Sequence, residues 1–336
     1  MKNVVIFGAT GNVGVYVVDY LKNNLNLNFY NIVTIGRKNT SFFKKQNLEY
    51  YQVDIQNKES FKSLPRPDIV VHLAGVLPAY LKEDSNSSYI TTNVLGTFNI
   101  LEYCRNGNAQ KILYSQSYAD INANIDVNPI LHPYAVRNYK YSGDHALYIF
   151  SKNMAVDMIE YYHQTYGINN IILRLPNIYL YHPETTYFVD GITKIIPYRY
   201  MINRAIRGEP IEIWGNPKKA KDIVYVKDFA QMIYRAILSN VESAIYNVGT
   251  GIATTLDDQV KGIISVFSKP QKVSKIIYNS NKCDALSYIM DIENAKKELN
   301  YRPKYDYISY LKDYKYEMEE NRFGELWNKW GKKWKK

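Results

Sequence analysis

Residues 4–14 read Val-Val-Ile-Phe-Gly-Ala-Thr-Gly-Asn-Val-Gly, and this stretch decides the fold. Four β-branched or aromatic residues predict a buried strand, which runs directly into glycines at positions 8, 11 and 14. A helical pattern of apolar side chains begins at once and continues to Leu21. Glycines at this spacing allow a tight turn, close approach of the backbone to a pyrophosphate and close packing of helix on strand. The stretch therefore predicts a dinucleotide-binding turn, with the helix N-terminus facing the phosphates.

The same alternation of strand and helix continues over about the first 175 residues. Further strands are expected at residues 32–35, 50–53, 69–73, 112–114 and 171–173. Several of these runs are continuously apolar, as strands buried on both faces must be. Helical spacing between them, for example over residues 94–101, indicates right-handed crossovers. We therefore predict an α/β fold of the Rossmann type, with a doubly wound parallel sheet and a smaller α/β lobe after it.

Proline-rich, irregular segments after Leu175 mark the change to that lobe. We expect a dinucleotide-binding domain at residues 1–176, with 220–247 returning to it. The substrate lobe then comprises residues 177–219 and 248–320. Residues 321–336 form a basic tail containing Trp327, Trp330 and Trp334.

Length and composition exclude several classes of protein. With 336 residues, 46% hydrophobic and 22% charged, the chain can fold around a large core. Its two cysteines, Cys104 and Cys283, exclude a disulfide framework, and its five histidines have no metal-ligand spacing. No apolar run is long enough to cross a bilayer and no secretory signal is visible, so a cytoplasmic location is expected. The net charge of +10 favours anionic partners, which include phosphorylated small molecules, nucleic acid and membrane surfaces.

The end of the second strand bears on the choice of cofactor. A carboxylate about 20 residues beyond the glycine turn would bind the 2′-hydroxyl of NAD. The chain instead has Gly36, Arg37 and Lys38, and a forked guanidinium suits a 2′-phosphate. We therefore predict NADP(H) in preference to NAD(H). Asp54, at the end of the third strand, has two interpretations: a contact to the adenine amino group or a capping role.

Tyr148 and Lys152 are four residues apart in a helical segment, so their side chains project from one face. A phenol with an ordinary pKa of about 10 becomes a proton shuttle near pH 7 only when its phenolate is stabilised by roughly 4 kcal/mol. A nearby ammonium group in a desolvated cleft supplies much of that energy. Upstream, the run from Lys111 to Ser117 ends another strand and places hydroxyl groups at the same sheet edge.

With these motifs in order, the sequence resembles the extended short-chain dehydrogenase/reductase family, in its sugar-nucleotide epimerase/dehydratase branch. The resemblance extends over nearly the whole chain. It is carried by the three glycines, Asp54, residues 72–75, 93–97, 173–179, 222–228, 246–251 and 298–303, Ser117, and the Tyr148/Lys152 pair.

The resemblance implies a role for each matching residue. Tyr148 is the acid/base, Lys152 lowers its pKa and holds the nicotinamide ribose, and Ser117, with Ser115 as the rival, orients the substrate oxygen. The substrate-binding residues implied are Ser117, Asn177, Arg204 and Lys221. The cofactor-binding residues expected are Gly8, Thr10, Gly11, Asn12, Val13, Gly14, Arg37, Lys38, Asp54, Ile55, Leu73, Ala74, Gly75, Asn93, Tyr148, Lys152 and Leu175.

Departures from the family pattern narrow the expected reaction. The 4,6-dehydratases of the family carry an acidic pair after the catalytic hydroxyl residue, whereas Ser117 precedes Tyr118 and Ala119, which disfavours dehydration. Ala119 also stands near the cysteine position of the combined epimerase-reductases, although His182 lies near their histidine position. C4 epimerisation and reduction of a 4-keto sugar remain, and Arg37 favours reduction. Lys221 replaces the usual arginine, which brings charge without the bidentate fork.

Three features leave alternatives open. Ser117 and Tyr148 are 31 positions apart, longer than is typical of the family, and this segment either covers the sugar site or decorates the surface. The Trp/Lys tail either packs on protein or binds a membrane surface of anionic lipid.

Homodimerisation is expected through helices at residues 92–104 and 150–162. Two other functions are alternatives to an enzyme: a redox-sensing NADP-binding module, which would usually lack the Tyr/Lys pair, and a nucleic-acid binder, for which no known motif is present.

Overall fold

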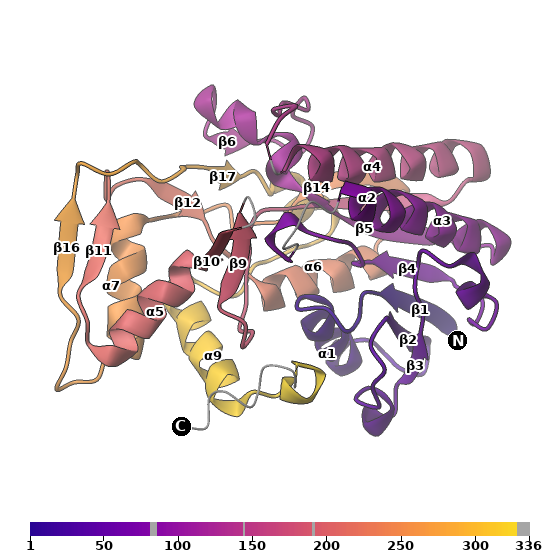
Figure 1. The fold of residues 1–336 in the computed structure, drawn as a ribbon. Helices are drawn as coiled ribbons and strands as arrows, with labels where there is room; N and C mark the ends of the chain where they lie inside the picture. Colours follow the sequence, from indigo (N-terminus) through magenta and orange to yellow (C-terminus); the bar gives the residue numbers. More distant parts are fainter. Residues whose placement is uncertain (81–85, 144, 190–191, 328–336) are drawn as a thin grey trace.

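The computed structural model describes residues 1–80, 86–143, 145–189 and 192–327. A parallel sheet of seven strands, in the order β14-β7-β5-β4-β1-β2-β3, forms its centre (Figure 1). The strands are β1 (Lys2–Phe7), β2 (Tyr30–Gly36), β3 (Glu49–Gln52), β4 (Ile69–His72), β5 (Lys111–Ser117), β7 (Asn169–Leu175) and β14 (Ser243–Asn247). The predicted Rossmann-type fold is confirmed. The strand order reverses between β1 and β4, and in such sheets ligands bind beyond the strand ends at that point.

Helices cover both faces of the sheet (Figure 1). Helices α1 (Gly14–Asn24) and α6 (Val226–Leu238) contact each other on one face, and α3 (Gly96–Asn106) and α4 (Ala146–Tyr166) contact each other on the other. The apolar run of β1 fits this arrangement. Val4 and Ile6 belong to one buried cluster, and Val5 and Phe7 belong to a second.

The later part of the chain builds the smaller lobe from short elements. Its helices are α5 (Pro197–Arg207), α7 (Leu256–Phe267), α8 (Glu293–Glu298) and α9 (Tyr307–Glu320). Its strands are β8 (Ile178–Tyr179), β9 (Thr186–Val189), β10 (Ile192–Ile195), β11 (Ile211–Trp214), β12 (Ala220–Asp222), β13 (Val224–Tyr225), β15 (Ala253–Thr255), β16 (Ile276–Asn279) and β17 (Ile289–Met290). Strands β12 and β13 pair with β15 and β8, whereas α6 packs on α1 and β14 pairs with β7 at the edge of the seven-stranded sheet.

The segment before α3 differs from the regular helix that the sequence predicts. Residues Tyr89–Leu95 (η4) form a π-helical stretch, preceded by the short helix α2 (Asn86–Ser88). Asn93 in this stretch is buried and is hydrogen-bonded to Val76 and Ser151. Local widening of a helix of this kind is frequent at functional sites.

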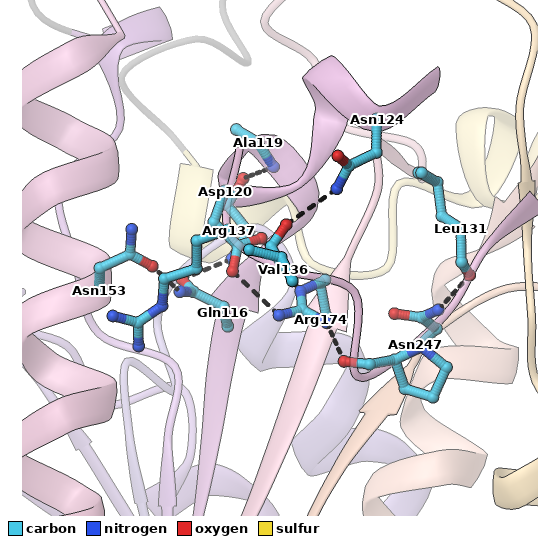
Figure 2. Close-up of polar contacts among 12 residues, drawn as sticks. Gln116, Ala119, Asp120, Asn124, Leu131, Val136, Arg137, Asn153, Arg174 and Asn247 are labelled. Carbon is cyan, nitrogen blue, oxygen red and sulfur yellow. Dashed lines mark hydrogen bonds and ion pairs between the residues drawn. The ribbon is translucent and has the colours of Figure 1, made fainter. Parts of the chain in front are cut away.

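The long segment after Ser117 packs on the ends of the sheet strands. Arg174, at the end of β7, donates from Nε and Nη2 to the two carboxylate oxygens of Asp120, each at 3.0 Å, and from Nη1 to the carbonyl of Pro133 (Figure 2). Strand β6 (Ile130–Leu131) pairs with β17, and the Asn247 amide donates to the Leu131 carbonyl at 2.7 Å. The described part of this segment is therefore joined to both lobes.

The tail can be followed to Trp327, and Trp330 and Trp334 lie outside the described residues. Trp327 is 2% exposed and packs on the rings of Tyr181 and His182. This part of the tail therefore packs on its own protein. Within the described ranges, the helices are all too short or too polar to cross a membrane.

Removing one partner of the buried Asp120–Arg174 pair should be costly. We expect Asp120→Ala to lower the free energy of unfolding by about 3–5 kcal/mol, because it leaves an uncompensated guanidinium, while Asp120→Leu with Arg174→Met recovers much of that loss. Urea titration measures both. Asp157→Ala is the control, because its bidentate pair with Arg137 is exposed and should contribute about 1 kcal/mol or less. Equal losses in the two alanine variants would contradict the argument.

Candidate active site

The turn between β1 and α1 accepts only glycine at two positions. Gly8 has a φ of +87°, and a Cβ there would lie 2.7 Å from the backbone nitrogen of Ala74. A Cβ at Gly14 would lie 2.1 Å from the carbonyl oxygen of Gly8. The turn and residues 73–75 therefore meet at the point where strand order reverses, and the α1 N-terminus begins there. This cradle fits a dinucleotide pyrophosphate.

The end of β2 borders the same cradle. A Cβ at Gly36 would lie 2.5 Å from Thr10 Oγ1, so the strand end packs directly on the turn. Arg37 is exposed there, whereas Lys38 Nζ donates to the Leu326 carbonyl at 2.9 Å. Lys38, which the sequence assigns to cofactor binding, is thus engaged by the tail.

Asp54 and Asn93 have structural partners. Asp54 is exposed, and its Oδ1 accepts the Gln56 backbone amide at 3.1 Å within a turn, whereas Asn57 caps the short helix that follows. The helix-capping role predicted for Asp54 is therefore not seen, and its contact to the adenine stays a prediction. Asn93 Oδ1 accepts the Val76 amide at 2.8 Å, and its Nδ2 donates to Ser151 Oγ at 2.9 Å. Asn93 thereby ties the loop after β4 to helix α4.

Ser117 and Tyr148 meet at the carboxyl end of β5. The Ser117 hydroxyl hydrogen-bonds the Tyr148 phenol and also accepts the Ala119 amide at 3.2 Å. Ser115, the rival hydroxyl, instead donates to the His72 carbonyl at 3.3 Å. The Gln116 side chain accepts the Ser117 amide at 2.8 Å and donates to Asn153 of α4 at 2.9 Å (Figure 2). These bonds fix the strand end against the helix that carries Tyr148.

The ionisation of the Tyr148/Lys152 pair differs from the expectation. Burial raises the pKa of Tyr148 to about 12, and the Ser117 hydrogen bond opposes that rise. Burial lowers the pKa of Lys152 to about 7. The Lys152 ammonium lies 4.1 Å from the centre of the Tyr114 ring. Burial thus favours the neutral form of both groups, and Lys152 is not among the groups that shift the pKa of Tyr148, so the acidifying role of Lys152 stays a prediction.

Lys221 approaches this region from β12. Its ammonium lies 5.6 Å from the centre of the Tyr179 ring and interacts electrostatically with Tyr118, the residue after Ser117. Tyr118 in turn packs on Tyr288, with ring centres 5.1 Å apart. Asn177 is exposed at the turn after β7.

Arg204 does not join the other predicted site residues. It lies in the last turn of α5, where the helix leads into β11 (Figure 1). Its guanidinium pairs with Glu209 at 3.4 Å and donates to the Tyr200 hydroxyl at 3.1 Å. These neighbours and the Pro210 carbonyl engage its donors, and substrate binding by Arg204 stays a prediction.

Comparison with known proteins gives the family. Residues 4–249 match the NAD dependent epimerase/dehydratase family. The chain belongs to this family. Among relatives, a putative UDP-glucose 4-epimerase of Methanocaldococcus jannaschii is 27% identical, over 89% of this chain and 97% of the relative. A dTDP-glucose 4,6-dehydratase of Haemophilus influenzae is 23% identical, over 90% and 94%. The fold is similar to that of the UDP-glucose 4-epimerase of Thermotoga maritima, with a TM-score of 0.75 at 22% identity, over 95% of this chain and 100% of that one.

Sequence patterns did not single out several residues that the structure places at this site. Asp120 is buried, interacts electrostatically with Tyr148 and is bound by Arg174. Tyr288 lies beside Lys221 because these two residues form a parallel β-bridge, although they are far apart in the sequence. In the part of the chain that the structure describes, we find no group of three or more His, Cys, Asp or Glu side chains suited to a metal ion.

Because burial lowers the pKa of Lys152, we predict that the buried amine lowers the free energy of unfolding at neutral pH. The unfolded chain, with a lysine pKa of about 10.4, binds more protons than the folded chain between about pH 7 and 10, so this group makes stability rise with pH across that window. We expect Lys152→Met to raise the Tm at pH 7, by roughly 2–4 °C for each kcal/mol gained in the free energy of unfolding. The variant should also lose the rise in stability that the titration of Lys152 causes.

Thermal unfolding between pH 6 and 9, without cofactor, measures this effect. Lys140→Met is the control, because Lys140 is exposed and should leave the Tm nearly unchanged. A Tm for Lys152→Met that is equal to or below that of the parent protein at pH 7 would disprove the argument.

Proposed function

We propose that this protein transfers hydride at C4 of a nucleotide-activated sugar, as a 4-epimerase or a 4-ketoreductase. The observation that carries the proposal is the Ser117–Tyr148 contact at the carboxyl end of β5, next to a glycine cradle that fits a dinucleotide. Relatives named as 4-epimerases of UDP-glucose and of UDP-glucuronate support the substrate class.

Each residue then has one task. Bound NAD(P) supplies the acceptor and donor of hydride. Tyr148 Oη takes the proton of the C4 hydroxyl as the sugar is oxidised and returns a proton to that oxygen when the 4-keto group is reduced. The Ser117 hydroxyl holds the same oxygen and stabilises its developing charge. Lys152 leaves the Tyr114 ring, binds the nicotinamide ribose and stabilises the Tyr148 phenolate. Lys221 offers a cation to the sugar diphosphate.

Elimination of water is less well supported than hydride transfer alone. A 4,6-dehydratase needs an acid and a base beside the sugar in addition to the tyrosine. The residues after Ser117 are Tyr118 and Ala119, and the next carboxylate, Asp120, is held by two bonds from Arg174. Burial raises the pKa of Asp120 and Arg174 opposes that rise, but both carboxylate oxygens are already occupied by bonds from Arg174. Because some relatives are named as dehydratases, the assay should compare loss of water with hydride transfer alone.

The assay that tests the function uses a panel of UDP- and dTDP-sugars together with their 4-keto forms. NADPH absorbance and product stereochemistry are followed in parallel. Inversion at C4 without net loss of NADPH identifies an epimerase, and stoichiometric loss of NADPH identifies a reductase. The second activity is favoured by one observation, the exposed Arg37 at the cofactor cradle.

The acid/base role predicts the effect of removing a single oxygen atom. We expect Tyr148→Phe to lower kcat by about 10² to 10⁴ while cofactor affinity stays unchanged, because only proton transfer is lost. Tyr316→Phe, the same substitution at an exposed position of α9, is the control. Turnover of Tyr148→Phe within a few-fold of the control would refute the role.

The predicted preference for NADP(H) over NAD(H) can be tested by changing Arg37. The forked guanidinium of Arg37 would bind the 2′-phosphate of NADP(H), so Arg37→Asp should weaken NADPH binding about tenfold or more and leave NADH binding nearly unchanged. Fluorescence titration measures both affinities, with Lys44→Ala as a control for loss of a nearby exposed charge. NADH affinity equal to or above that of NADPH in the parent protein would contradict the preference.

We also propose a homodimer formed through α3 and α4. Large apolar side chains are exposed along this pair of helices and at the end of η4. They are Leu95, Phe98, Met154, Tyr161 and Tyr166. Because α3 and α4 contact each other, these exposed apolar side chains lie on neighbouring helices, and a second copy of the chain could cover them.

A further inference from the structure

Strand β5 extends past the end of its neighbour β4, and this overhang carries Ser117. His72, the last residue of β4, lies opposite Tyr114 of β5. Strand β5 continues from Ser115 to Ser117, and these residues pair with β7 on the other side. Backbone groups of the overhang that face the side of β4 must find partners outside that ladder, because a buried amide left unpaired costs free energy.

The side chain of Gln116 supplies such a partner. Gln116 Oε1 accepts the Ser117 backbone amide at 2.8 Å, and Gln116 Nε2 donates to Asn153 Oδ1 of α4 at 2.9 Å (Figure 2). Gln116 and Asn153 are both buried. Asn153 Nδ2 has no hydrogen-bond partner in the described part of the chain, so in that part the Asn153 side chain is held by its bond from Gln116. One glutamine therefore links the backbone of Ser117 to helix α4.

The same helix carries the two groups of the proposed proton transfer. Tyr148 lies in the first turn of α4, and Lys152 directly precedes Asn153. The Ser117 hydroxyl hydrogen-bonds the Tyr148 phenol. The strand end and the helix are thus joined twice, once through the Ser117 hydroxyl and once through the Ser117 amide, Gln116 and Asn153. A closed set of buried hydrogen bonds restricts the position of the hydroxyl more than a single bond does.

We propose that Gln116 is a positioning residue, which holds the Ser117 hydroxyl at the distance from Tyr148 that proton transfer needs. Gln116 acts through the backbone of Ser117 and through its bond to α4. A hydroxyl that stabilises a developing charge must be in place before the reaction, and a displacement of about 1 Å costs on the order of 100-fold in rate. The inference rests on the proposed function in one respect, that Ser117 and Tyr148 act on the same substrate oxygen.

The first test compares Gln116→Met with Gln231→Met. Both substitutions keep the approximate volume of the side chain and remove two hydrogen bonds. Gln231 of α6 is also buried, and its two bonds join the backbone of Arg302. We expect Gln116→Met to lower kcat about 10- to 100-fold, while KM and the affinity for NADPH stay within about twofold of the parent protein. Gln231→Met should leave all three unchanged, and an equal kcat in the two variants would overturn the inference.

A double-mutant cycle with Ser117→Ala shows whether Gln116 acts through Ser117. Once the hydroxyl is removed, its placement no longer affects the rate. Adding Gln116→Met to Ser117→Ala should therefore lower kcat by no more than about twofold. Losses that multiply in the double variant contradict the inference, because Gln116 would then act by a route that does not include the Ser117 hydroxyl.

The pH profile is a readout that a loss of stability alone does not move. The Ser117 hydrogen bond opposes the rise in the pKa of Tyr148 that burial causes. Weakening this bond in Gln116→Met should move the midpoint of kcat for sugar oxidation upward by about 0.5 pH unit, in the same direction as Ser117→Ala. Tyr89 and Asp120 also act on Tyr148 and are the same in all these variants. A midpoint equal to that of Gln231→Met would argue against the positioning role.

Asn153→Leu gives an answer even where Gln116→Met fails to fold. It removes the bond from Gln116 to α4 but leaves the Ser117 amide paired, so we expect a smaller loss of kcat, about three- to tenfold. An Asn153→Leu variant that binds NADPH and turns over as fast as the parent protein overturns the inference. Failure of the proposed function has a different signature, because Ser117→Ala and Tyr148→Phe would then retain the turnover of the parent protein.

Discussion

The active-site end of the molecule depends on the polar side chains that helix α4 buries against the sheet. Tyr148, Ser151, Lys152 and Asn153 are all buried on this helix. Each must find a partner there, because an unpaired polar group in the interior costs about 1–3 kcal/mol. Ser117 binds Tyr148, Asn93 binds Ser151, and Gln116 binds Asn153. These three bonds hold α4 in one position against β5 and η4, and they thereby place the Tyr148 phenol at the strand end.

The same burial explains why the chain without ligand is not in a catalytic protonation state. Low polarity disfavours both the phenolate of Tyr148 and the ammonium of Lys152, and the pKa of the first is raised while that of the second is lowered. Neither group is among the causes of the other's shift in pKa, and burial is the first cause for both. A bound dinucleotide would change this balance by offering ribose hydroxyls to Lys152 and by bringing positive charge near Tyr148. The proposed acidifying effect of Lys152 on Tyr148 would therefore need the bound cofactor.

Local sequence patterns were sufficient for the part of the site built from neighbouring residues. The glycine turn, the strand that ends at Ser117 and the four-residue spacing of Tyr148 and Lys152 each belong to one element, and the parallel sheet brings the ends of these elements together. The partners that individual side chains find were less predictable from the sequence. Lys38 and Arg204 carry the expected charge, but Leu326 and Glu209 engage them. Both partners are brought there by tertiary structure or by a local turn that periodicity does not describe.

The residues that sequence reasoning missed share a physical origin: each is defined by a partner far away in the chain. Asp120 is 54 positions from Arg174, and Tyr118 packs on Tyr288 from the other lobe. Both follow Ser117 within three residues. Tyr118 contacts the other lobe through Tyr288, whereas Asp120 is held by Arg174 at the end of β7 in the same domain. A substrate bound between Ser117 and Lys221 would contact both sides of this junction. The Tyr118–Tyr288 contact, with ring centres 5.1 Å apart, would then help to fix the distance between the Ser117 hydroxyl and the Lys221 ammonium, the two groups proposed to hold opposite ends of that substrate.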